Sequence, residues 1–138
     1  MSTEVPVLLF ACIHNSGRSV AAEVLARHYG GERVLVSSAG SEPGSGVNPA
    51  VAEVLAERGL RTDEHTPTML TPDGVQRADV VVTMGCGESC PIFPGKRYED
   101  WQIDDPKGQE LAVVRRIVDD VDARVRALLA DLQVPLAD

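Results

Sequence analysis

Aromatic residues are scarce in this sequence, at 4% of its 138 residues, with a single tryptophan. A buried core must therefore be built from aliphatic side chains, which the apolar content of 43% can supply. No apolar run approaches the ~20 residues that a membrane-spanning helix needs. No charged segment precedes the first short apolar run, as a secretory signal peptide would require. We therefore expect a cytoplasmic protein with one domain, residues 1–138, and no membrane partner.

Positive charge is also in short supply, because 13 Lys and Arg residues face 21 Asp and Glu residues, a formal net charge of -8. This balance disfavours nucleic acid as a partner, although a small anion can still bind where the local field of a pocket is positive. The three cysteines, Cys12, Cys86 and Cys90, cannot all pair within one chain. Catalysis or redox chemistry therefore explains them better than a disulfide framework. A monomer is the default expectation.

Apolar runs alternate with helical patterns along the chain. Continuous apolar runs predict buried strands at residues 5–11, 34–38 and 79–84, and a further short strand is expected within residues 96–103. Capping residues and 3.6-residue periodicity predict helices at residues 20–29, 49–58, 72–77 and 109–132. This alternation predicts a parallel sheet covered on both faces, with ligands bound beyond the carboxyl ends of the strands.

Helical periodicity also predicts which faces are buried. In the first helix the expected buried stripe consists of Val20, Val24, Leu25 and His28. In the last helix we expect a solvated face that carries Arg115, Asp119, Asp122 and Arg126.

The segment Cys12-Ile13-His14-Asn15-Ser16-Gly17-Arg18-Ser19 joins the first predicted strand to the first predicted helix. Such a turn can point its N–H groups inward at a helix N-terminus, where a tetrahedral oxyanion would also meet the guanidinium of Arg18. The same field stabilises a thiolate at Cys12. Ser19 is expected to donate to that thiolate, to cap the helix, or both. The alternative for Cys12 is an inert buried thiol, and its spacing from Arg18 is a weak signal by itself.

Cys86 and Cys90 lie in a glycine- and proline-rich loop after the third predicted strand. If that strand runs parallel to the first, this loop and the Cys12 loop open at the same edge of the sheet, and distant cysteines can meet there. A redox pair is our interpretation. The alternatives are half of a zinc site or two inert thiols, and zinc requires about four ligands that the three histidines are not spaced to complete.

The segment from Cys12 to Ser19 resembles the phosphate-binding loop of low-molecular-weight protein tyrosine phosphatases and of the arsenate reductases that share their fold. Three later runs follow in the order of that group: Ser38-Ala39-Gly40, Thr83-Met84-Gly85-Cys86 and Asp105-Pro106. The resemblance covers nearly the whole chain and implies a four-stranded parallel sheet flanked by helices. It also implies an oxyanion site formed by Cys12, Ile13, His14, Asn15, Ser16, Gly17 and Arg18. It favours Asp105 over the adjacent Asp104 as the general acid that protonates the departing oxygen.

Two features favour a reductase within this group. The phosphatases typically carry aromatic residues after the Asp-Pro pair, whereas Lys107-Gly108 follow here. A phosphatase has no need of Cys86 and Cys90, while a thiol-dependent reductase needs electrons. The resemblance therefore implies arsenate reduction, with a Cys12–Cys86–Cys90 disulfide relay regenerated by a thioredoxin-type reductant. The relay cysteines are closer in sequence than is usual in thioredoxin-linked relatives, which leaves glutaredoxin or a small thiol such as mycothiol as alternatives.

Two other functions are consistent with the same residues. Phosphate and arsenate have the same shape, so a phosphatase for small phosphomonoesters or phosphotyrosine is one alternative, and an anion or thiol sensor without turnover is another. Phosphate or sulfate is expected to occupy the loop as well. In some of these reductases a potassium ion binds beside the residue matching Asn15, and the resemblance places Glu23 and Ser38 next to it. The alternative is that Glu23 is an ordinary helix carboxylate. We expect no tightly bound cofactor.

Overall fold

The computed structural model describes residues 5–63, 65–85 and 96–136. Its sheet has four strands, all parallel, in the order β2-β1-β3-β4. The strands are β1 (Val7–Cys12), β2 (Leu35–Gly40), β3 (Val80–Thr83) and β4 (Arg97–Asp100). The helices are α1 (Arg18–Gly30), η1 (Gly31–Arg33), α2 (Pro49–Glu57), α3 (Pro72–Arg77) and α4 (Leu111–Asp131). The predicted fold class is confirmed.

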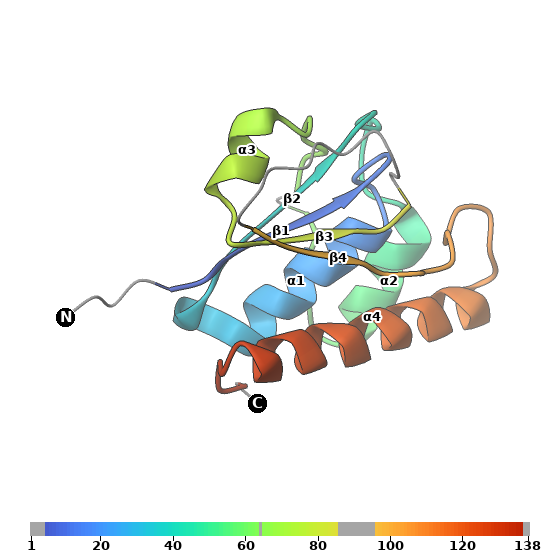
Figure 1. Ribbon diagram of the computed structural model, residues 1–138. Helices are drawn as coiled ribbons and strands as arrows, with labels where there is room; N and C mark the ends of the chain where they lie inside the picture. Colours follow the sequence, from blue (N-terminus) through green and yellow to red (C-terminus); the bar gives the residue numbers. More distant parts are fainter. Residues whose placement is uncertain (1–4, 64, 86–95, 137–138) are drawn as a thin grey trace.

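Helices cover both faces of the sheet, with α1, α2 and α4 on one side and α3 on the other (Figure 1). The central strand β1 buries side chains on each face. Leu8 and Phe10 belong to the larger core under α1 and α4, and Leu9 packs with Val75 and Val81 under α3. Burying each such side chain contributes roughly 1.5–3 kcal/mol. Burial on both faces explains why this strand reads as a continuous apolar run.

The strand boundaries differ slightly from the predicted ones. β1 begins at Val7, two residues later than expected, and β2 continues past Ser38 to Gly40. The extension has a structural reason, because Cys12 and Gly40 pair at the ends of β1 and β2. A Cβ atom at Gly40 would come within 2.6 Å of the carbonyl oxygen of Ile13, so the extra strand residue must be glycine for the chain after β1 to turn there.

The helix caps confirm two predicted helix starts. The side chain of Asn48 accepts hydrogen bonds from the N–H groups of Ala50 and Val51 at the start of α2. Thr71 accepts from the N–H of Gly74 at the start of α3. The capping role considered for Ser19 is wrong, because α1 begins at Arg18 without a side-chain cap and Ser19 lies inside the helix.

The buried stripe expected on α1 is wrong at one position and incomplete at others. His28 is exposed, while Ala21, Ala22 and Ala26 are buried. The reason is that α1 packs against both the sheet and α4, so it buries a wider face than one periodic stripe. Small side chains allow this close approach on two sides.

The solvated face expected on α4 is interrupted by Asp122, whose side chain is 8% exposed. Its carboxylate accepts a hydrogen bond from the hydroxyl of Tyr29 on α1, at 2.6 Å. Arg58, just after α2, and Arg126 lie 3.5 and 3.2 Å from it. Asp122 on α4 therefore contacts residues of α1 and of the end of α2 instead of facing solvent. No helix in the described part of the chain is both long and apolar enough to cross a membrane.

Candidate active site

The loop after β1, residues 12–17, turns its carbonyl groups away from its centre. Each of these carbonyl oxygens accepts a hydrogen bond from outside the loop, at 2.7–3.2 Å. The donors are the N–H groups of Ser41, Glu42, Gly44 and Asn48 after β2, the N–H of Ala21, and Nε2 of His65. Because the C=O and N–H of a trans peptide point in opposite directions, the N–H groups of the loop turn toward its centre. This is the geometry of an anion-binding nest.

Asn15 reverses the chain within the loop, with a left-handed φ of 53°. Asparagine adopts this conformation more readily than most residues. Its side-chain oxygen accepts from the N–H of Thr68 at 3.0 Å, which sets the orientation of the amide. The amide nitrogen then donates to the hydroxyls of Ser19, at 2.8 Å, and Ser38, at 2.9 Å. The buried Asn15 therefore supports the loop from behind.

The sulfur of Cys12 lies 2.9 Å from the hydroxyl oxygen of Ser19. A thiolate can only accept, so Ser19 donates its hydroxyl proton to the sulfur when Cys12 is ionised. Such a bond is strongest to a thiolate, and the N-terminus of α1, which begins at Arg18, favours negative charge at the same place. Cys12 is only 2% exposed, but it contributes to the wall of an open pocket.

The pocket in front of the loop has a volume of about 700 Å³. It brings Asp105, which is far away in the sequence, to Cys12 and Arg18, while Asp104 is not among its lining residues. The carboxylate of Asp105 accepts from the N–H of Lys107 at 3.0 Å, which fixes the turn. The loop residues at the wall are Cys12, His14, Ser16, Gly17 and Arg18, whereas Ile13, Asn15 and Ser19 do not line it.

Glycine lets the acid-bearing turn lie against the anion loop. A Cβ atom at Gly17 would come within 2.8 Å of Cγ of Pro106. At the other side of the pocket, a Cβ atom at Gly44 would come within 2.8 Å of Oγ of Ser16. Both walls therefore approach the loop at positions without a side chain.

Residues 44–47 form a wall of this pocket that the sequence patterns did not assign to the site. The one signal for them is a glycine- and serine-rich tract just beyond the carboxyl end of the second strand. Together with residues 105–108, they form the mouth of the pocket. Among the described residues that line the pocket there is no Phe, Tyr or Trp.

The guanidinium of Arg18 reaches toward the carbonyl oxygen of Ile103, at 3.5 Å, and lies against Gly85. Gly85 is the last described residue before Cys86. Cys86 and Cys90 themselves lie outside the described residues, so the structure neither joins them to the pocket nor separates them from it.

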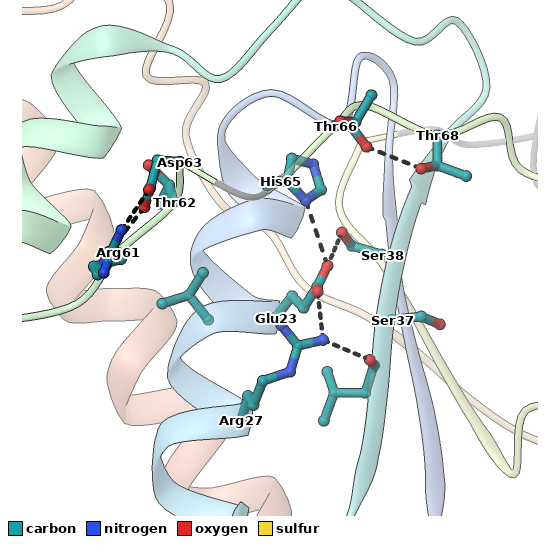
Figure 2. A pocket seen from close by; sticks show the side chains of 12 residues that line it. Glu23, Arg27, Ser37, Ser38, Arg61, Thr62, Asp63, His65, Thr66 and Thr68 are labelled. Carbon is teal, nitrogen blue, oxygen red and sulfur yellow. Dashed lines mark hydrogen bonds and ion pairs between the residues drawn. The ribbon is translucent and has the colours of Figure 1, made fainter.

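A second pocket, of about 500 Å³, is lined by Glu23 and Ser38, two of the three residues expected near a potassium ion, but not by Asn15 (Figure 2). Glu23, on α1, accepts the hydroxyl proton of Ser38 at Oε1 and pairs with Nη2 of Arg27 at Oε2, 2.6 Å away. His65 points its Nδ1 toward Oε1 at 3.7 Å. Ser38 in turn accepts from Asn15, so Glu23 is linked to the anion loop.

Comparison with known proteins identifies relatives of the whole described fold. Arsenate reductase 1 of Bacillus cereus is 37% identical over 124 residues, which are 86% of this chain and 90% of that protein. The glutaredoxin arsenate reductase of Synechocystis sp. is 34% identical over 128 residues, 91% of this chain and 97% of that protein.

Among solved structures, the thioredoxin-dependent arsenate reductase of Corynebacterium glutamicum superposes with a TM-score of 0.85 and 42% identity. The similarity covers 96% of this chain but 64% of that one, so this chain spans just under two thirds of that protein's length. Residues 7–136 match the family described as low molecular weight phosphotyrosine protein phosphatase. The match extends from the first strand to beyond the last helix, and the protein belongs to this family.

Proposed function

We propose that this protein reduces arsenate to arsenite in arsenic detoxification, as a cytoplasmic monomer. The observation that carries the proposal is one pocket that holds a thiol, a guanidinium and a carboxyl group, from Cys12, Arg18 and Asp105. The described residues that line it include no Phe, Tyr or Trp, which suits a small inorganic oxyanion. The names of the relatives from Bacillus cereus and Corynebacterium glutamicum support the same substrate.

In the first step, arsenate binds in the nest with its oxygens against the loop N–H groups and Arg18. The Cys12 thiolate attacks arsenic, so that an S–As bond forms and an As–O bond breaks. Asp105 supplies the proton with which the departing oxygen leaves as water. The N–H groups and the N-terminus of α1 stabilise the charge that develops on the remaining oxygens.

In the second step, the Cys86 thiolate attacks the sulfur of Cys12. The S–As bond breaks and its electron pair stays on arsenic, which passes from As(V) to As(III) and leaves as arsenite. A Cys12–Cys86 disulfide remains. Cys90 then attacks Cys86 and transfers the disulfide to Cys86–Cys90, which frees Cys12. These assignments rest on the family resemblance, because both relay cysteines lie outside the described residues.

A thioredoxin-type dithiol protein completes the cycle by reducing the Cys86–Cys90 disulfide. The two relay cysteines support this choice, since a disulfide within the chain suits exchange with a dithiol protein. Two relatives are named for such reductants, thioredoxin in one and glutaredoxin in the other. A small thiol such as mycothiol would instead resolve the Cys12 adduct directly and leave Cys86 and Cys90 unused.

The second candidate function is a phosphatase for small phosphomonoesters, which the family description favours. It would use the same loop and Asp105, with water releasing the phosphate from Cys12. The pocket mouth argues against an aryl phosphate, because residues 44–49 and 105–108 include no Phe, Tyr or Trp on which an aryl group could stack.

The proposal is tested by NADPH consumption with arsenate, thioredoxin and thioredoxin reductase. We expect steady consumption by the native protein and its loss in Cys12→Ser, Cys86→Ser and Cys90→Ser. Loss in Cys12→Ser alone would contradict the relay and favour a small-thiol reductant. No consumption by the native protein, together with phosphate release from p-nitrophenyl phosphate, would establish the phosphatase instead.

A further inference from the structure

The oxygen atoms that would coordinate a potassium ion behind the anion loop already have partners. Asn15 Oδ1 accepts from the N–H of Thr68 at 3.0 Å. Glu23 Oε1 accepts from the hydroxyl of Ser38, and Glu23 Oε2 pairs with Arg27. A hard cation needs several oxygen atoms free to turn toward it. The described residues therefore do not fit the potassium ion that the family resemblance implies.

Arg27, whose side chain is 58% exposed, brings a positive charge to the carboxylate that such a cation would bind. It follows Glu23 by one helical turn, and its Nη2 lies 2.6 Å from Glu23 Oε2. The same nitrogen donates to the carbonyl oxygen of Val36 on β2 at 3.0 Å (Figure 2). One positive group thus holds a carboxylate of α1 and a carbonyl of β2 together, as a metal ion with oxygen ligands from both would.

Among the residues that the structure describes, the charges that line this pocket balance. Among its described lining residues, two carboxylates, Glu23 and Asp63, face two guanidinium groups, Arg27 and Arg61, and Arg61 pairs with Asp63 at 2.6 Å. His65 Nε2 contacts the carbonyl oxygen of Asn15, which can only accept, so this nitrogen carries a proton. An added monovalent cation would meet no unpaired carboxylate among these residues.

The direction of the hydrogen bonds connects Arg27 with the anion loop. Arg27 donates to Glu23, and Glu23 accepts from Ser38. Ser38 accepts from the Asn15 amide, whose other hydrogen goes to Ser19 beside the nucleophile. Glu23 is almost fully buried, at 11% exposure, and Arg27 supplies the opposite charge that offsets the cost of burying a carboxylate there.

We infer that Arg27 is the resident cation of this site and that the anion loop keeps its shape without potassium. Arg27 is a positioning residue, since it acts through Glu23, Ser38 and Asn15. The inference concerns the loop itself, so it holds for any tetrahedral oxyanion and does not depend on arsenate being the substrate.

The test compares thermal unfolding of the full chain in KCl, NaCl and tetramethylammonium chloride at equal ionic strength. We expect one Tm for the native protein in all three salts. Arg27→Gln should lower Tm and create a rise of about 3 °C that only KCl produces, because Glu23 is then free to hold an ion. Arg27→Lys should keep the salt-independent behaviour, because it restores a positive charge.

Arg124→Gln is the matched control. Arg124 also pairs with a carboxylate one turn earlier, Asp120 at 2.9 Å, and also reaches a backbone carbonyl, that of Gln102 at 3.5 Å. Its loss should lower Tm equally in every salt. Calorimetric binding of phosphate gives a second readout, which should be independent of potassium in the native protein and potassium-dependent in Arg27→Gln.

Two results would overturn the inference. A potassium-specific rise in the Tm or phosphate affinity of the native protein would show that a metal ion binds while Arg27 is present. The absence of any potassium-specific change in folded Arg27→Gln would show that Arg27 does not occupy the place of a cation.

Discussion

The guanidinium of Arg18 lies directly against Gly85, where a Cβ atom would come within 2.6 Å of Nη1. Gly85 also has a φ of 94°, a conformation that side chains with a Cβ atom rarely adopt. Glycine at this position therefore allows the positive φ of the backbone after β3. It also leaves room for the guanidinium of Arg18. A glycine two residues after the end of β3 thus sets where the positive charge of the anion pocket lies.

We expect Gly85→Ala to weaken oxyanion binding, because the added methyl group displaces the guanidinium of Arg18 from its place. A loss of about 1.4 kcal/mol corresponds to a tenfold higher KM for arsenate and a tenfold weaker phosphate affinity. Steady-state kinetics and calorimetric phosphate titration measure the two quantities.

Gly59→Ala is the control for backbone strain. Gly59 has a φ of 77°, but a Cβ atom there would meet no atom within 4 Å. This variant should lose stability without a change in KM. Equal increases in KM for both variants would show that the effect comes from strain and not from Arg18.

Ser19→Ala should slow the alkylation of Cys12 by iodoacetamide at neutral pH. The variant removes the hydroxyl that lies 2.9 Å from the sulfur, and a hydrogen bond to a charged group contributes roughly 1.5–3 kcal/mol. We expect a rate about tenfold lower. Ser38→Ala should have a smaller effect, because Ser38 contacts the sulfur only through Asn15 and Ser19. Equal rates in Ser19→Ala and the native protein would contradict this role.

Asp105→Asn and Asp104→Asn form a matched pair, because only Asp105 lines the pocket with Cys12. General acid catalysis is worth roughly 10²–10⁴-fold, so Asp105→Asn should lower kcat by about that factor. Asp104→Asn should leave kcat nearly unchanged. Single-turnover reduction of arsenate is the measurement. A larger loss in Asp104→Asn would transfer the acid role to that residue.

Tyr29→Phe should destabilise the protein by about 1 kcal/mol at neutral pH, because Asp122 loses its hydroxyl donor. The hydrogen bond to Asp122, with burial and the negative charge of Asp122, raises the pKa of Tyr29 above its usual value. Since the folded pKa exceeds the unfolded one, this stabilisation is complete below about pH 10 and is lost as pH rises through the raised pKa.

Urea unfolding at pH 7 and at several values above pH 10 measures this dependence. The difference between the native protein and Tyr29→Phe should shrink as the pH increases. A difference that stays constant through the alkaline range would show that the hydroxyl of Tyr29 does not titrate against Asp122.

Local patterns were sufficient to predict much of the fold. Asn48 and Thr71 marked helix starts because a cap depends on residues within one turn. The apolar run of β1 marked a strand with two buried faces. Asp122 could not be predicted as buried, because its partners Tyr29 and Arg58 come from other helices and only packing brings them together.

Part of the candidate site could likewise be predicted from local sequence, and part could not. The loop from Cys12 to Arg18 could be recognised because its residues are contiguous. Residues 44–47 and Gly85 could not, since their part in the pocket depends on where chain segments leave neighbouring strands. The pairing of Arg27 with Glu23 has the spacing of an ordinary helical ion pair, and only the position of β2 shows that it closes the expected ion site.

The parallel sheet also separates the pocket from the outer ends of the fold. Cys12 lies at the carboxyl end of β1, whereas the start of β1 and the end of α4 lie at the opposite end of the molecule (Figure 1). A tether attached near Val7 or Asp131 would therefore leave the pocket facing solution. The protein could be immobilised on a bead or an electrode through that end, and its thiol chemistry followed on the support.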